Sequence, residues 1–200
     1  MAITPKQFEA MRARIARKPA AAPVFSPALR PPHRDEIIIG IDPSLRGTGY
    51  GVIQPAKPHP RALTHGTILC PSAWERSRCL LRISEVLRDV VAQHHPAVCA
   101  IEGLFYAQNL QTALIMGEAR GAALAALASA GLEIYEIAPR KVKQAIVGYG
   151  AAQKLAVAKM VQRLLRLPAP PAPDAADALA LALTYLQEHA RFNLSPPKRV

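Results

Sequence analysis

The chain has 200 residues, half of them hydrophobic, which suits a single domain with a sizeable core. Its formal net charge of +11 at pH 7 favours a polyanionic partner. The three cysteines have no CxxC spacing, which argues against a disulfide framework or a zinc site and fits a reducing, cytosolic compartment. No apolar run is long enough to cross a membrane, and the N-terminus lacks the apolar region of a secretory signal.

Residues 1–35 are expected to form a flexible, basic extension rich in alanine and proline. A short basic helix over Lys6–Lys18 is expected to precede the segments Ala20–Pro23 and Pro27–Pro32, which cannot easily form a packed element. The arginine-rich, acid-poor start also weakly resembles an organellar transit peptide, but a disordered basic arm is the favoured interpretation.

Apolar runs and helical periodicity between residues 36 and 190 predict an α/β domain. Strands are expected at 37–42, 48–54, 62–69, 97–102 and 132–137. Helices are expected at 72–94, 110–130, 139–147, 151–167 and 174–189, with a frayed tail over 191–200. The first three strands would form an antiparallel meander, and the last two would pair in parallel through right-handed crossovers. The predicted sheet is therefore mixed and five-stranded, with helices on both faces.

Four carboxylates stand in settings that favour function. Asp42 and Glu102 each end a predicted buried strand, and ligands of open α/β sheets gather at the carboxyl ends of the strands. Asp174 and Asp177 lie one helical turn apart at the start of the last predicted helix, where the helix dipole favours negative charge. If the four converge, their mutual repulsion and burial require compensation, and divalent cations are the simplest form of it.

Hard ions such as Mg²⁺ or Mn²⁺ prefer oxygen ligands. Two such ions about 3.5–4 Å apart can stabilise the attacking water and the leaving oxygen of a phosphodiester displacement, and Asp42 is the best candidate to bridge them. Each carboxylate taken alone also has a structural interpretation: Asp42 as a turn residue, Asp174 as a helix cap and Asp177 as a solvated first-turn residue.

These motifs, read in order over about residues 37–190, resemble the RuvC family of crossover junction endodeoxyribonucleases, the Holliday junction resolvases. The matching segments are Ile39–Ser44, Thr48–Ile53, Ile101–Glu102, Phe105, Asn109, Gly117, Ala119–Gly121, Val142–Gln144, Val147–Gly148, Lys154 and Asp174–Ala180. The resemblance implies a ribonuclease H-like fold and Mg²⁺-dependent nicking of two strands at a four-way DNA junction. It also implies two metal ions in each active site, with Mn²⁺ as a substitute, and a location in the bacterial cytoplasm.

By the same resemblance, the metal-binding and catalytic residues are Asp42, Glu102, Asp174 and Asp177, the last either as a direct ligand or by orienting a ligand or water. Phe105 matches an aromatic residue that contacts a base, although core packing is its ordinary role. Lys143 and Lys154 match lysines beside the scissile phosphate, although they would otherwise be solvated. Arg120 is expected either to bind a DNA phosphate or to pair with Glu118 or a helix end.

The resemblance further implies a homodimer, which suits the approximate two-fold symmetry of a four-way junction, and a RuvA–RuvB branch-migration complex as a partner. The helix at 110–130 is a candidate for the dimer seam, because Gly117 and Gly121 would permit close approach of a neighbour, although packing within the chain explains these residues equally well. Two features depart from the family pattern: Gln108 stands where lysine is usual, and residues 1–35 have no counterpart.

Three other interpretations compete. The glycine-rich hairpin that follows Asp42 is similar to the phosphate-binding hairpin of actin-like ATPases and sugar kinases, but no second phosphate loop follows it. A catalytically silent junction-binding homologue is disfavoured because all four carboxylates are present. A nuclease of the same fold that acts on RNA–DNA hybrids is disfavoured by the matches at Phe105 and the two lysines.

Overall fold

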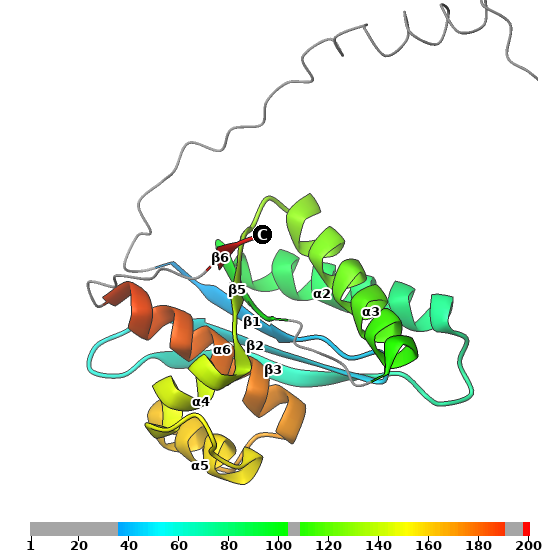
Figure 1. The fold of residues 1–200 in the computed structure, drawn as a ribbon. Helices are drawn as coiled ribbons and strands as arrows, with labels where there is room; N and C mark the ends of the chain where they lie inside the picture. The colour runs from blue at the N-terminus through cyan, green and yellow to red at the C-terminus, as the bar shows by residue number, and fades with distance from the viewer. Residues whose placement is uncertain (1–35, 104–108, 191–197) are drawn as a thin grey trace, which may run out of the picture. The chain divides into compact units, whose positions relative to one another are not determined.

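A six-stranded mixed sheet forms the centre of the fold in the computed structural model, which describes residues 36–103, 109–190 and 198–200 (Figure 1). Its strands are β1 (Ile38–Asp42), β2 (Gly47–Gln54), β3 (Arg61–Leu69), β4 (Val98–Glu102), β5 (Glu133–Ile137) and β6 (Lys198–Arg199). They lie in the order β3-β2-β1-β4-β5-β6. The described residues fall in one compact unit, Pro32–Val200, and the predicted extension over residues 1–35 lies outside them.

The strand pairing confirms the predicted mixed sheet. β1, β2 and β3 form an antiparallel meander, whereas β1 with β4 and β4 with β5 pair in parallel. The two central strands β1 and β4 are almost entirely apolar because helices cover both of their faces.

The prediction of five strands was wrong by one. Lys198 and Arg199 pair antiparallel with β5, and Arg199 Nη2 lies 3.0 Å from a carboxylate oxygen of Glu133. Part of the predicted frayed tail is therefore a short edge strand. A strand of two exposed basic residues has no hydrophobic alternation, so periodicity could not reveal it.

Helices flank the described part of the sheet on both faces, with α2 and α3 on one side and α4, α5 and α6 on the other (Figure 1). Their bounds are α2 (Arg76–His94), α3 (Leu110–Ser129), α4 (Pro139–Val147), α5 (Lys154–Leu165) and α6 (Pro173–Ala190). The alternation of β1 divides the core between the two sides: Ile39 and Ile41 pack with α2 and α3, whereas Ile38 packs with α6. None of the described helices is long and apolar enough to cross a membrane.

Helix α2 begins three residues later than predicted. Ser72 was expected to cap the helix, but residues 71–75 precede it, the N-cap is Glu75 and the first helical residue is Arg76. The Arg46 guanidinium donates hydrogen bonds to the carbonyl oxygens of Pro71, at 2.6 Å, and Trp74, at 3.1 Å. Because these carbonyls face an arginine from another loop, the segment is held outside the helix.

Glycines in β1 and β2 allow α6 to lie directly on the sheet. A Cβ added at Gly40 would overlap the carbonyl oxygen of Ala178, and one at Gly49 would overlap the carbonyl oxygen of Asp174. At Gly51 an added Cβ would lie 2.6 Å from a methyl carbon of Leu179. The backbone of α6 therefore approaches these strands more closely than any larger residue would permit.

The close approach predicted at Gly117 and Gly121 of α3 is wrong for the described chain. A Cβ added at either position would meet no heavy atom within 4 Å. These glycines are therefore not needed for packing within the described residues, and a dimer seam along α3 stays a prediction.

We predict that Gly40→Ala destabilises the fold and that Gly121→Ala does not. The new methyl group at residue 40 collides with helix backbone, so the free energy of unfolding should fall by about 2–3 kcal/mol, the upper part of the range for overpacking. At residue 121 the methyl group has space, and alanine favours a helix over glycine by up to about 1 kcal/mol. Urea denaturation of both variants measures the difference, and equal stabilities would contradict the packing of α6 described above.

Candidate active site

Asp42 and Glu102 meet at one edge of the sheet. They are the last residues of the neighbouring parallel strands β1 and β4, in which Ile41 is in register with Ile101. The two carboxyl groups lie within hydrogen-bonding reach of each other. We call this the carboxylate edge: the sheet edge at which β1, β3 and β4 end and β2 begins.

Helix α6 brings the other two carboxylates to the carboxylate edge. Asp174 Oδ2 lies 3.0 Å from the position that a Cβ would take at Gly47, the first residue of β2. Asp177 lies close enough to Asp42 and Glu102 that its charge raises the pKa of both. The convergence expected from the sequence is therefore present, and the close packing of α6 produces it.

Crowding and burial shift the ionisation of the central pair. Burial is the largest cause that raises the pKa of Asp42 from 3.8 to about 8, followed by the charges of Glu102 and Asp177. Burial also raises the pKa of Glu102, and the charge of Asp177 adds to the shift. These carboxylates lack sufficient positive charge around them, which is the electrostatic condition that a divalent cation corrects.

Two of the candidate metal ligands have partners within the acidic cluster. Across residues 36–103, 109–190 and 198–200, no three His, Cys, Asp or Glu side chains form a group ready to hold a metal ion. The Asp42 carboxyl group lies within hydrogen-bonding reach of Glu102, and Asp177 Oδ2 forms an ion pair with Lys154 Nζ at 3.0 Å. The oxygen-only donor set of these residues suits a hard cation.

Both predicted lysines lie beside the carboxylates. Lys154, the first residue of α5, pairs with Asp177, and this hydrogen bond is the largest cause that raises the pKa of Lys154. Lys143 of α4 is close enough that its charge lowers the pKa of Glu102. The roles of both lysines toward DNA stay predictions, while Phe105 and Gln108 lie outside the described residues.

The position of Arg120 contradicts the phosphate contact predicted for it. The residue is 6% exposed; Nη1 donates to the carbonyl oxygen of Glu102, and Nη2 lies 2.6 Å from Glu136 Oε2. The alternative pairing with Glu118 is also wrong, because Glu118 pairs with Arg76. A guanidinium enclosed in this way holds the end of β4 in place and does not face DNA.

Glu136 is the site residue that sequence reasoning missed. It pairs with Arg120, and its side chain also occupies the space over Gly103, where an added Cβ would lie 3.2 Å from Glu136 Cγ. This pair therefore fixes the backbone immediately after Glu102. The available signal was a carboxylate within β5, a strand expected to be mostly buried.

A central mixed sheet with carboxylates at one edge defines a ribonuclease H-like fold with a nuclease-type acidic site. The family described as "Crossover junction endodeoxyribonuclease RuvC" matches residues 38–185. The proteins of that name from Akkermansia muciniphila and Halorhodospira halophila are 46% and 47% identical to this chain, covering 74% of it and 89% and 88% of their own lengths.

Among solved structures, Thermus thermophilus RuvC in complex with Holliday junction substrate superposes with a TM-score of 0.74. Its sequence is 33% identical, and the match covers 82% of this chain and 99% of that one. The chain belongs to the RuvC family, whose nucleases depend on metal ions. The fold and family predicted from the sequence are confirmed.

We predict that Arg120→Ala is strongly destabilising and that Arg76→Ala is nearly neutral. Loss of Arg120 leaves Glu136 without its partner in a largely buried site, which should cost roughly 2–4 kcal/mol. Arg76 and Glu118 form an exposed pair at 3.0 Å, and such a pair contributes at most about 1 kcal/mol. Chemical denaturation of the two variants provides the comparison, and similar losses would mean that the buried pair has no special structural role.

We also predict that Asp42→Asn raises the melting temperature in the absence of divalent cations. Because the folded state raises the pKa of Asp42 from 3.8 to about 8, it holds this proton more tightly than the unfolded chain does. The resulting destabilisation is absent below pH 3.8, grows as the pH rises and is complete above about pH 8. The gain should therefore be a few degrees and larger at about pH 8 than at about pH 5.

Thermal melts of the wild type and Asp42→Asn in EDTA at both pH values measure this gain. A lower melting temperature for the variant at both values would instead identify Asp42 as a structural turn residue.

Proposed function

We propose that this protein resolves four-way DNA junctions by paired, metal-dependent cleavage of phosphodiester bonds. The observation that carries the proposal is the contact between Asp42 and Glu102 at the carboxylate edge, with Asp177 close enough to disfavour their ionisation. Membership of the RuvC family and the likeness to a relative solved with Holliday junction substrate support the choice of DNA substrate.

The residues that would hold the metal are Asp42, Glu102, Asp174 and Asp177. Mg²⁺ fits their oxygen-only donor set, with Mn²⁺ as an alternative. The proposal includes two ions, because two divalent cations would balance the charge of the four ionised carboxylates. When bound, such ions supply a water of lowered pKa and positive charge for the phosphate oxygens.

The lysines would stabilise the negative charge that develops on the phosphate during cleavage. The Lys154 side chain is 70% exposed although it contacts Asp177, so its ammonium group can turn toward a DNA phosphate without losing a buried position. Lys143 would act from α4, where its charge already lowers the pKa of Glu102. The hydrogen bond to Asp177 raises the pKa of Lys154, so this ammonium group is charged at neutral pH.

The proposal includes a homodimer, because two opposed cuts at a nearly two-fold symmetric junction require two active sites with the same symmetry. It also includes a RuvA–RuvB branch-migration complex as a partner and a location in the bacterial cytoplasm. These elements follow from the family, whose relatives described above are bacterial.

We predict that, in Mg²⁺, the protein cleaves a synthetic four-way junction in preference to a linear duplex or an RNA–DNA hybrid. Asp42→Asn should reduce the cleavage rate at least about 100-fold while junction binding is retained, because the metal ligand is lost but the basic surface remains. Asp89→Asn, which removes an exposed carboxylate of α2, is the matched control and should cleave normally.

Gel assays of cleavage and binding on the same DNAs test this prediction. Equal cleavage of all three substrates would contradict junction selectivity, and normal cleavage by Asp42→Asn would remove Asp42 from the reaction centre.

A further inference from the structure

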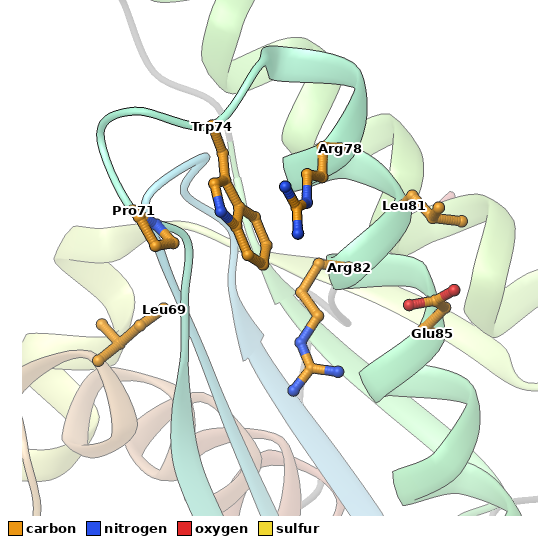
Figure 2. Close-up of a pocket in the computed structure, with 7 residues that line it drawn as sticks. All are labelled: Leu69, Pro71, Trp74, Arg78, Leu81, Arg82 and Glu85. Atoms are coloured by element: carbon orange, nitrogen blue, oxygen red, sulfur yellow. The ribbon is translucent and has the colours of Figure 1, made fainter.

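A groove between the end of β3 and the first turns of α2 lies outside every role assigned so far. We call it the Trp74 groove; its volume is about 460 Å³ (Figure 2). Its lining residues are Leu69, Pro71, Trp74, Arg78, Leu81, Arg82 and Glu85. The volume falls within the range of about 300–1,000 Å³ that is usual for ligand sites.

The Trp74 groove lies at the carboxylate edge. Leu69 ends β3 and is in register with Gly47, the first residue of β2. Gly47 in turn lies against the carboxylate of Asp174. Leu69 of the groove and Asp174 of the acidic cluster therefore both lie beside Gly47, although α2 and α6 cover opposite faces of the sheet.

Arg46 fixes the groove to the active-site turn. This residue lies between Asp42 and Gly47, and its Nη1 donates to the carbonyl oxygens of Pro71 and Trp74 and contacts Cys79 Sγ at 3.2 Å. The backbone carbonyl oxygen of Arg46 also accepts a 3.1 Å hydrogen bond from Cys70 N. The groove wall is thus attached to the loop that follows the candidate metal ligand Asp42.

The residues that line the groove favour a ligand that carries several negative charges and also has an apolar surface. The Arg78 guanidinium lies 4.0 Å from the centre of the Trp74 ring, a cation–π contact that orients it. Figure 2 shows the Arg82 side chain beside the same groove, and across the described residues Arg82 has no ion-pair partner within 4 Å. The lining thus contains two arginines and one acidic residue, Glu85. Leu69 adds an apolar side chain that is 71% exposed.

We propose that the Trp74 groove binds the sugar–phosphate backbone of a junction arm next to the strand that is cleaved. Arg78 and Arg82 contact phosphates, for which guanidinium groups are well suited, while Trp74 and Leu69 contact the sugar face. The inference rests on the proposed function, and it favours DNA over a protein segment because the groove is cationic and adjoins the candidate cleavage site.

Trp74 supplies a direct test, because it is the only tryptophan in the chain. The full-length protein is titrated with a fluorescently labelled four-way junction in EDTA, so that the DNA stays uncut. Tryptophan emission and anisotropy of the labelled DNA are followed together. The emission should change with the same midpoint as the anisotropy, because DNA displaces water and disturbs the stack of Arg78 on Trp74.

The variant with both Arg78→Ala and Arg82→Ala should bind the junction at least fivefold more weakly. Loss of two phosphate contacts should reduce the slope of log K against log salt by roughly 1.8. Arg88→Ala is the matched control, since it removes an exposed charge from the same helix outside the groove and should leave the slope unchanged. Melting temperatures of all variants are measured to confirm that they fold.

Two results would overturn the inference. If the junction binds and is cleaved in Mg²⁺, yet the emission is constant and the double variant keeps wild-type affinity and slope, the groove does not contact DNA and a protein occupant is favoured. If the wild type neither binds nor cleaves the junction, the proposed function and the groove assignment both fail. Cleavage by the wild type therefore separates the two failures.

Discussion

The contact of α6 with β1 and β2 is the constraint on which the site depends. Gly40 and Gly49 remove the side chains that would otherwise separate the helix from the sheet, so helix backbone lies directly on strand backbone. This contact sets how close Asp174 and Asp177 lie to Asp42 at the end of β1. A packing feature of the core thereby decides how closely four carboxylates approach one another, and a larger residue at either glycine would separate the two halves of the site.

Such proximity opposes stability in the protein alone. Burial at the carboxylate edge raises the pKa of Asp42 to about 8, so at neutral pH the folded chain favours a proton or a cation at this carboxyl group. Lys154 partly compensates by pairing with Asp177, while Arg120 and Glu136 hold the end of β4 from the other side. Part of the stability of the domain is given up to keep the carboxylates together, which is common at functional sites.

The sequence was most informative where the signal is local. Apolar runs predicted β1 and β4, and the spacing of Asp174 and Asp177 placed both at the start of a helix. The errors concern contacts between distant segments: Arg120 pairs with Glu136 of β5, and β6 forms only because β5 offers a free edge. No periodicity encodes a partner on another element, so such pairs emerge only when the chain is folded.

An acidic centre within a basic protein separates binding from cleavage. The carboxylates would repel DNA, but the net charge of the whole chain is +11, so the protein as a whole attracts a polyanion. Cations bound by the carboxylates would remove the local repulsion. Arg46 links the two regions, because its hydrogen bonds to Pro71 and Trp74 hold the wall of the Trp74 groove against the turn after Asp42. In the proposed mode of binding, the arginines would position the DNA backbone and the candidate metal ligands would supply the chemistry.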